Sequence, residues 1–248
     1  MGALRGHVSI GSSTVTGTWS LIPSIEVFSL MCRGPIDFVI IDWEHGGWSP
    51  SETEIAIQVA KMNEVDVVIR IASPSKELVQ RALDCGPDGL QVSGINSERD
   101  FKLMMDSATF PPLGIRGYSP WSFSSLMKDA SSWDPLLIPQ IESMAAANFF
   151  KSLSSKDLNA MDLVFIGRYD LSISLGVPGE ISADSVKKVI SDLVELSEHY
   201  SFKVGTVAVD LMDAENMESL GVSYISVGSD RLFLAQGIAG VVNMPDDT

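Results

Sequence analysis

Eight short runs rich in β-branched and aromatic residues recur along the chain, and the stretches between them have helical periodicity. This alternation predicts repeated βαβ units built around a parallel sheet. Several runs are apolar almost throughout, as in Phe38-Val39-Ile40-Ile41, which is typical of parallel strands covered on both faces. The predicted strands are residues 15–19, 38–43, 65–71, 89–92, 136–142, 163–166, 204–209 and 224–227.

Eight parallel strands fit either a closed barrel or a doubly wound open sheet. No Gly-x-Gly-x-x-Gly turn follows the first predicted strand, so a dinucleotide-binding open sheet loses its main support. The chain has 248 residues, 45% of them hydrophobic, which is enough for one eight-stranded α/β barrel. We therefore predict an α/β protein with a single (β/α)8 TIM barrel domain over residues 1–248.

Local signals predict where helices begin and end. Residues 182–184 are expected to open a long helix. Ser49, Ser75 and Ser97 are predicted helix N-caps. Gly86 and Gly221 are predicted to lie just after helix C-termini. One segment, about residues 111–135, is too long for an ordinary connector, which is typical of a loop that is functional or ordered by a neighbouring subunit.

The charge and cysteine content narrow the function classes. A net charge of -15 disfavours nucleic acid and acidic membrane surfaces as partners. The N-terminus lacks a signal-peptide pattern, and no run reaches the roughly 18 apolar residues that a membrane helix needs. Cys32 and Cys85 lack metal-type spacing and are predicted to be packed, reduced thiols. We expect a cytoplasmic protein with no nucleic acid and no membrane among its partners.

Polar residues are concentrated where the predicted strands end, which is where the active sites of (β/α)8 barrels lie. Because these strands all point the same way, we expect their ends to meet at one opening. The polar ends are Asp42-Trp43-Glu44-His45, Arg70, Gln140-Ile141-Glu142 and Gly167-Arg168-Tyr169-Asp170.

Two of these carboxylates, Glu142 and Asp170, predict an oxygen-rich site for a divalent metal ion such as Mg²⁺, Mn²⁺ or Co²⁺. A 2-oxo acid could fill further positions on that ion, which would polarise its keto group. Arg70 could then stabilise the enolate. The alternative is that both acids only cap or flank helix starts, and the residues alone leave the two readings about even.

A proton carrier is also needed, and His45 alone among the histidines falls on the predicted rim, where Asp42 or Glu44 could orient it. An isolated loop histidine that only hydrogen-bonds locally is the alternative. A Schiff-base mechanism is disfavoured because the lysines fall in predicted helices and loops or, for Lys203, before a strand.

The same residues lie in motifs spread from about Gly17 to Gly228. They include Gly17-Thr18-Trp19, Asp42-Trp43-Glu44-His45-Gly46, Val68-Ile69-Arg70, Pro111-Pro112-Leu113-Gly114-Ile115-Arg116-Gly117, Gln140-Ile141-Glu142-Ser143 and Gly167-Arg168-Tyr169-Asp170-Leu171-Ser172. In these motifs the chain resembles the HpcH/HpaI aldolases, a family of metal-dependent class II pyruvate aldolases.

The resemblance assigns roles to residues already singled out. It implies Glu142 and Asp170 as metal ligands, Arg70 as the pyruvate-binding arginine, and His45 with Asp42 as the base and its acidic partner. Further matches implied near the pocket are Trp19, Gln140, Phe165 and Gly167. It also implies a homo-oligomer, a hexamer built as a trimer of dimers in which a C-terminal helix packs on a neighbour.

The chain departs from the family pattern near the predicted mouth. Arg168 stands where relatives usually have proline, and a proline common near the end of the fourth strand is replaced around Ser93. The segment 117–123 lacks an arginine often found after it in relatives. We hypothesise that Arg168 contacts an acidic or phosphorylated part of the acceptor; a solvent-facing arginine is the alternative.

The predicted reaction is reversible cleavage of a 4-hydroxy-2-oxo acid to pyruvate and an aldehyde, with oxaloacetate decarboxylation as a further activity of the same site. Two rivals are kept. One is a citrate-synthase-like or CoA-ester lyase that uses the same enolate site on a thioester. The other is a barrel that binds a 2-oxo acid without turnover.

Overall fold

The computed structural model describes residues 14–127 and 133–242 together with Leu4 and Val8. Eight parallel strands form a closed barrel in sequence order, and β8 pairs with β1 to close it. The predicted (β/α)8 barrel is therefore confirmed, and each predicted strand matches an observed one to within two residues at either end. The strands are β1 (Val15–Ser20), β2 (Phe38–Asp42), β3 (Asp66–Ile71), β4 (Gly89–Val92), β5 (Leu136–Ile141), β6 (Leu163–Ile166), β7 (Lys203–Ala208) and β8 (Tyr224–Ser229).

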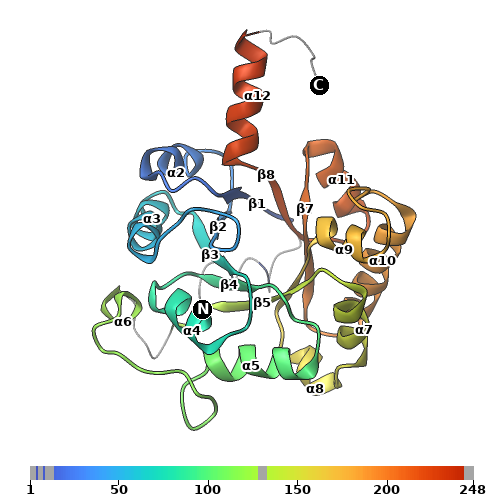
Figure 1. Cartoon of the computed structure of the whole chain (residues 1–248), viewed down its shortest axis with the longest axis horizontal. Coiled ribbons are helices and arrows are strands. Elements are labelled where there is room, and N and C mark those ends of the chain that lie inside the picture. Colours follow the sequence, from blue (N-terminus) through green and yellow to red (C-terminus); the bar gives the residue numbers. More distant parts are fainter. Residues whose placement is uncertain (1–3, 5–7, 9–13, 128–132, 243–248) are drawn as a thin grey trace.

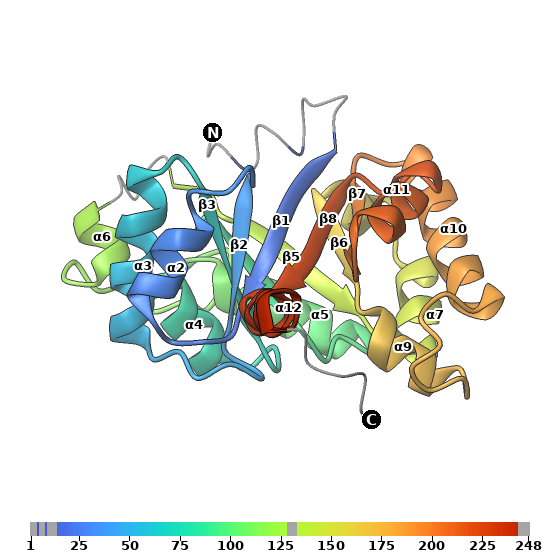
Figure 2. The same cartoon turned by 90° about the horizontal axis from the view of Figure 1, so that it is seen from above.

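Helices follow the strands and surround the barrel (Figure 1 and Figure 2). They are α2 (Ile25–Met31), α3 (Pro50–Met62), α4 (Lys76–Asp84), α5 (Glu98–Ala108), α6 (Phe123–Met127), α7 (Met144–Ser152), α8 (Ser155–Asn159), α9 (Arg168–Ser174), α10 (Asp184–Glu198), α11 (Leu211–Ser219) and α12 (Asp230–Val242). None of the helices in the described part of the chain is long and apolar enough to cross a membrane.

The helix boundaries follow the predicted local signals in most places. Ser49 forms a capping box with Glu52, and serine side chains also cap α4 and α5. Gly86 and Gly221 come after α4 and α11 with positive φ, as predicted. The start of α10 differs, because its N-cap is Ala183 and no side chain caps it.

The two predicted thiols are free and buried, and burial raises the pKa of Cys32 and of Cys85 to about 12. The irregular segment at 111–135 contains α6, and its Arg116 is buried against the rings of Phe110 and Trp133. Residues 128–132 of this segment lie outside the described residues.

The alternation of side chains along each strand decides what reaches the mouth. In β2, Val39 and Ile41 pack with the surrounding helices, whereas Phe38 and Ile40 belong to the cluster inside the barrel. Side chains two apart share a face of a strand, so the interior row of β2 ends at Asp42. By the same alternation, the interior row of β3 runs from Val68 to Arg70.

Candidate active site

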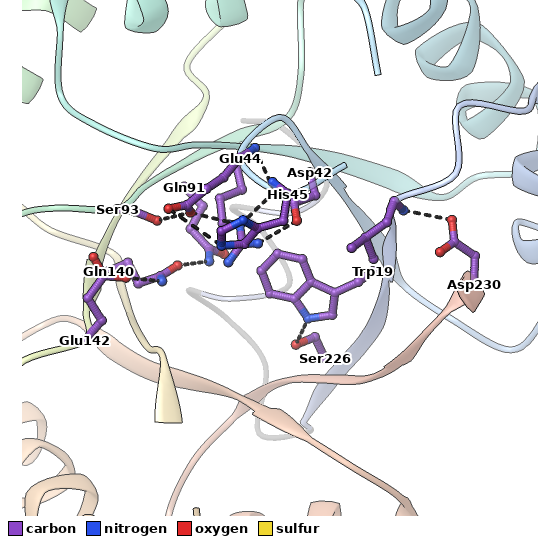
Figure 3. A network of polar contacts seen from close by, with 12 residues as sticks. Trp19, Asp42, Glu44, His45, Gln91, Ser93, Gln140, Glu142, Ser226 and Asp230 are labelled. Atoms are coloured by element: carbon purple, nitrogen blue, oxygen red, sulfur yellow. Dashed lines mark hydrogen bonds and ion pairs between the residues drawn. The ribbon is translucent and has the colours of Figure 1, made fainter. Parts of the chain in front are cut away.

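A cavity of about 430 Å³ opens at the carboxyl ends of the strands, within the usual size range of small-molecule sites. The polar contacts around it are drawn in Figure 3. Among its lining residues are most of those predicted from the sequence, namely Trp19, Asp42, His45, Arg70, Gln140, Gly167 and Asp170. The structure thus brings these residues together, and their chemical roles remain predictions.

Arg70 is held from two directions. Its Nε donates a hydrogen bond to Oδ1 of Asp42 at 2.9 Å, and its Nη2 donates to Oδ2 at 2.5 Å. The face of the guanidinium lies over Trp19, with 4.3 Å between its carbon and the ring centre. Because two contacts fix this planar group, it is preorganised to bind a carboxylate or a developing enolate oxygen through its remaining N–H groups.

His45 lies in the turn after β2, with 64% of its side chain exposed. The sequence left Asp42 and Glu44 open as its acidic partner, and the family resemblance favoured Asp42. The structure differs: the Asp42 carboxylate accepts the backbone N–H groups of Glu44 and His45 and pairs with Arg70. The imidazole Nε2 instead lies 3.9 Å from Oε1 of Glu44.

Glu44 connects His45 to the inner part of the site. Its Oε2 accepts a hydrogen bond from the Ser93 hydroxyl at 2.8 Å and lies 3.5 Å from Nε of Arg70. A serine at position 93 can donate this side-chain hydrogen bond, which a proline could not. Ser93 thereby helps to fix Glu44.

A chain of amides supports Glu142 (Figure 3). Gln91 donates from Nε2 to Oε1 of Gln140 at 2.6 Å, and Gln140 donates from its own Nε2 to Oε2 of Glu142 at 2.6 Å. The backbone N–H of Gly94 donates to the other oxygen of Glu142 at 2.8 Å. Both glutamines are buried. The Gln140 amide therefore orients Glu142 as well as lining the cavity.

The electrostatics of Glu142 fit a bound cation. Burial raises the pKa of this carboxyl, the hydrogen bonds from Gly94 and Gln140 lower it in part, and the negative charges of Glu44 and Asp170 raise it further. Glu142 therefore lies among negative charges, and a bound cation would stabilise its ionised form. Glu142 is half-buried at the start of α7, where Ser143 provides the cap, so the exposed helix-start acid is not what the structure shows.

Asp170 approaches from the first turn of α9 and is exposed to the cavity. The N-cap of that helix is Gly167, so Asp170 does not cap it. A Cβ atom at Gly167 would lie 3.0 Å from Nε2 of Gln140 and 3.3 Å from Cβ of Glu142. The glycine thus lets the turn that carries Asp170 pass close to Glu142.

No three His, Cys, Asp or Glu side chains gather as a metal cluster in the part of the chain that the structure describes. The protein would therefore supply two carboxylate ligands, Glu142 and Asp170, and leave the remaining positions to substrate and water. This donor set, all oxygen, fits a hard divalent cation.

The prediction for Arg168 was wrong. Its side chain is fully buried and does not line the cavity, so it is neither a substrate contact nor a solvent-facing residue. It forms a bidentate ion pair with Asp213 of α11. Burial alone would raise the pKa of Asp213, but hydrogen bonds from Arg168 and from the N–H of Val209, with the charge of Arg168, lower it.

Sequence reasoning also missed several residues. Gln91 ends the interior row of a strand, so the rule that found Gln140 could have found it. Ser226, which accepts the indole N–H of Trp19 at 2.8 Å, had no distinguishing signal. Asp213 lies 45 residues beyond Arg168 and reads as an ordinary first-turn acid.

Comparisons with known proteins identify a family and a shared fold. Residues 17–236 match the family model described as HpcH/HpaI aldolase/citrate lyase. A pyruvate aldolase of Rhizobium etli is 28% identical over 89% of each chain. A 2-keto-3-deoxy-L-rhamnonate aldolase of Klebsiella pneumoniae is 26% identical over 96% of this chain and 88% of its own. A crystal structure of an HpcH/HpaI aldolase/citrate lyase family protein from Burkholderia cenocepacia shares the fold, with a TM-score of 0.90, 21% identity and 98% coverage of both chains.

Proposed function

The chain belongs to the HpcH/HpaI aldolase/citrate lyase family, and from that premise we propose that it is a carbon–carbon lyase that cleaves and forms 4-hydroxy-2-oxo acids. The products of cleavage are pyruvate and an aldehyde. One observation carries the proposal: a fixed arginine, an exposed histidine and the Asp170 carboxylate line one cavity at the carboxyl ends of the strands, and Glu142, which does not line it, lies near enough to Asp170 for their charges to interact.

The 2-oxo acid end of the substrate binds beside Arg70. Asp42 and Trp19 fix the guanidinium before substrate arrives, so its free N–H groups stabilise negative charge on the enolate without reorganisation. Glu142 and Asp170 would hold a divalent metal ion, Mg²⁺, Mn²⁺ or Co²⁺, which as a Lewis acid would supply polarisation of the keto group.

His45 moves the proton in cleavage. It takes the proton of the C4 hydroxyl, the C3–C4 bond breaks, and the electron pair of that bond passes to the pyruvate enolate as the aldehyde carbonyl forms. Protonation of C3 then gives pyruvate. Oε1 of Glu44 lies 3.9 Å from Nε2 of the imidazole and is the acidic group beside it. Oxaloacetate decarboxylation passes through the same enolate and belongs to the proposal.

We also propose that the protein works as a homo-oligomer. In Figure 1, α12 stands away from the ring of helices that surrounds the barrel. Several of its apolar side chains are exposed, among them Phe233, Leu234 and Ile238. An exposed apolar helix of this kind supports burial against another copy.

The test is pyruvate release from a panel of 4-hydroxy-2-oxo acids by protein loaded with Mn²⁺, with an EDTA-treated sample as the control. We expect release that EDTA abolishes and added Mn²⁺ restores. A second readout, exchange of the methyl protons of pyruvate in D₂O followed by NMR, reports enolate formation without any aldehyde. Metal-loaded protein that neither releases pyruvate nor exchanges these protons would overturn the proposal.

A further inference from the structure

The cavity has a charged wall and an apolar wall, and the apolar wall indicates which class of aldehyde binds. The charged groups come from the ends of β2 and β3 and from α9. Around the remaining arc, where β7, β8 and β1 lie side by side, Ser229 contributes a hydroxyl and most of the other lining side chains are apolar. The aliphatic ones are Leu21, Val207, Val209 and Leu232.

This apolar wall continues outward to the rim. Val209 is 37% exposed, and beyond it Leu211 and Met212 at the start of α11 are 74% and 73% exposed. Tyr169, which also lines the cavity, is 50% exposed. A substituent that leaves the reacting carbonyl in this direction meets mainly apolar side chains, and burial of apolar surface there favours an apolar substituent.

The cavity also lacks a cation for an acidic acceptor. Of the described residues that line it, Arg70 is the only lysine or arginine, and Asp42 neutralises it. Arg168, the other arginine near the mouth, is buried in its pair with Asp213. An aldehyde that carries a carboxylate or phosphate therefore finds no compensating charge along this wall, and the desolvation of its anionic group opposes binding.

The cavity also offers few free hydrogen-bonding side chains that could bind hydroxyl groups of the aldehyde. Both ends of the Gln140 amide are engaged, by Gln91 and by Glu142. The hydroxyl of Ser229 accepts the backbone N–H of Leu232 and keeps its own proton to donate. A polyhydroxylated aldehyde would find few such partners along this wall and would bury its other hydroxyl groups against apolar side chains, which weakens binding.

We infer that the acceptor is an uncharged aldehyde with an aliphatic or aromatic substituent that packs on the wall formed by Val207, Val209 and Leu232. The inference rests on the proposed aldolase function and names its substrate class. In the synthetic direction, C3 of pyruvate loses a proton to the base and bonds to the aldehyde carbon. The carbonyl electron pair moves to its oxygen, which takes up a proton to give the 4-hydroxy group.

The experiment compares kcat/KM for addition of pyruvate to aldehydes by the Mn²⁺-loaded protein. Propanal, pentanal, hexanal and benzaldehyde form the apolar set, and glyceraldehyde and succinic semialdehyde are the hydroxylated and acidic counterparts. We expect kcat/KM to rise about fourfold per methylene from propanal to hexanal. Pentanal should exceed succinic semialdehyde and glyceraldehyde by about tenfold or more.

Variants of the wall sharpen the test. Leu232→Arg places a cation on it and should raise the ratio of succinic semialdehyde to pentanal by about tenfold, whereas Leu30→Arg on the exposed side of α2 should leave the ratio unaltered. Should Leu232→Arg fail to fold, Leu232→Ala serves instead, because it should reduce the gain from pentanal to hexanal.

The possible outcomes distinguish failure of the apolar-acceptor inference from failure of the proposed aldolase function. Exchange of pyruvate methyl protons with kcat/KM equal or higher for the acidic or hydroxylated aldehydes overturns the inference and leaves the aldolase standing. Absence of both exchange and addition with every aldehyde overturns both. Exchange together with the apolar preference, lost or reversed in the Leu232 variants alone, supports the inference.

Discussion

The two ends of the barrel are built from the same strands by different means. At the amino end, the rings of Phe38 and Tyr224 stack with their centres 4.0 Å apart inside the barrel. At the carboxyl end, two residues beyond the last apolar side chain in the same interior row, Asp42 binds Arg70 through paired hydrogen bonds. Packing positions one end, and directional polar contacts position the other.

This difference separates what the fold needs from what the site needs. Apolar packing stabilises the barrel over a broad contact area, whereas charged groups remain costly unless each has a partner. We therefore expect changes at the amino end to affect stability and changes at the mouth to affect chemistry, except where the mouth contains a buried ion pair. Four variants or conditions test this division.

The largest effect should come from Asp213→Ala. This change lies at the mouth but should affect stability, because it removes one partner of a buried ion pair. The change leaves the buried Arg168 without its partner, which costs about 3–5 kcal/mol and lowers the thermal unfolding midpoint by roughly 10 °C. The matched double variant, Arg168→Met with Asp213→Leu, should regain most of this loss because it removes both charges. Equal midpoints for the single variant and the unmodified protein would contradict the structural role of the pair.

Glu142→Gln should show the opposite profile. The neutral amide replaces one of the two proposed metal ligands, so we expect kcat/KM to fall by about 10²–10³-fold and Mn²⁺ binding measured by calorimetry to weaken. The midpoint of the metal-free protein should fall only slightly: the variant removes a carboxyl whose ionisation burial disfavours, but its amide NH₂ faces one of the two N–H donors, from Gly94 or Gln140. Glu195→Gln, on the exposed side of α10, is the control. Unaltered Mn²⁺ affinity would remove Glu142 from the metal site.

Gly17→Ala tests the packed end. A Cβ atom at this position would lie 2.4 Å from both the ring and the carbonyl oxygen of Phe38, so overpacking should cost about 1–3 kcal/mol in stability. The kcat of the folded variant should equal that of the parent. Gly237→Ala makes the same change where the new atom meets nothing within 4 Å, and should stabilise by up to about 1 kcal/mol. A fall in kcat for Gly17→Ala would show that the two ends are coupled.

The smallest effect concerns pH. Because burial raises the pKa of Glu142 in the folded protein, the folded state holds this proton more tightly than the unfolded chain does. Its contribution to stability is present below the unfolded value, about 4.3, and is lost as the pH rises through the folded one, with a slope of at most about 1.4 kcal/mol per pH unit. The midpoint difference between metal-free parent protein and Glu142→Gln should therefore change across this range; a constant difference would reject the pKa shift.

The barrel could be predicted from the sequence because its signals are local. Apolar runs mark the strands, and serines such as Ser49 and Ser97 mark helix starts within a few residues of themselves. The interior rows also place Asp42 and Arg70 at the mouth by counting alone. Such signals depend only on neighbouring residues along the chain, so they can be recognised without knowledge of the tertiary structure.

The pairing of side chains could not be predicted in this way. The sequence predicted an enolate beside Arg70 and an acidic acceptor group beside Arg168, and in the structure each arginine has an acidic side chain as its partner, Asp42 and Asp213. Those partners come from other elements, and only the packing of the elements decides which acid each arginine reaches. The apolar wall was missed for another reason: residues such as Val207 look like ordinary barrel interior in the sequence.

The two walls also occupy separate stretches of the gene. The charged residues of the cavity fall between Asp42 and Asp170, and the apolar wall, apart from Leu21, falls between Val207 and Leu232. Mutations confined to the later stretch can diversify the accepted aldehyde while the earlier codons, and the enolate chemistry they specify, stay under purifying selection. A mutant library restricted to residues 207–232 should therefore alter which aldehydes are accepted, and hence which aldol products form, while the charged residues of the cavity stay unchanged.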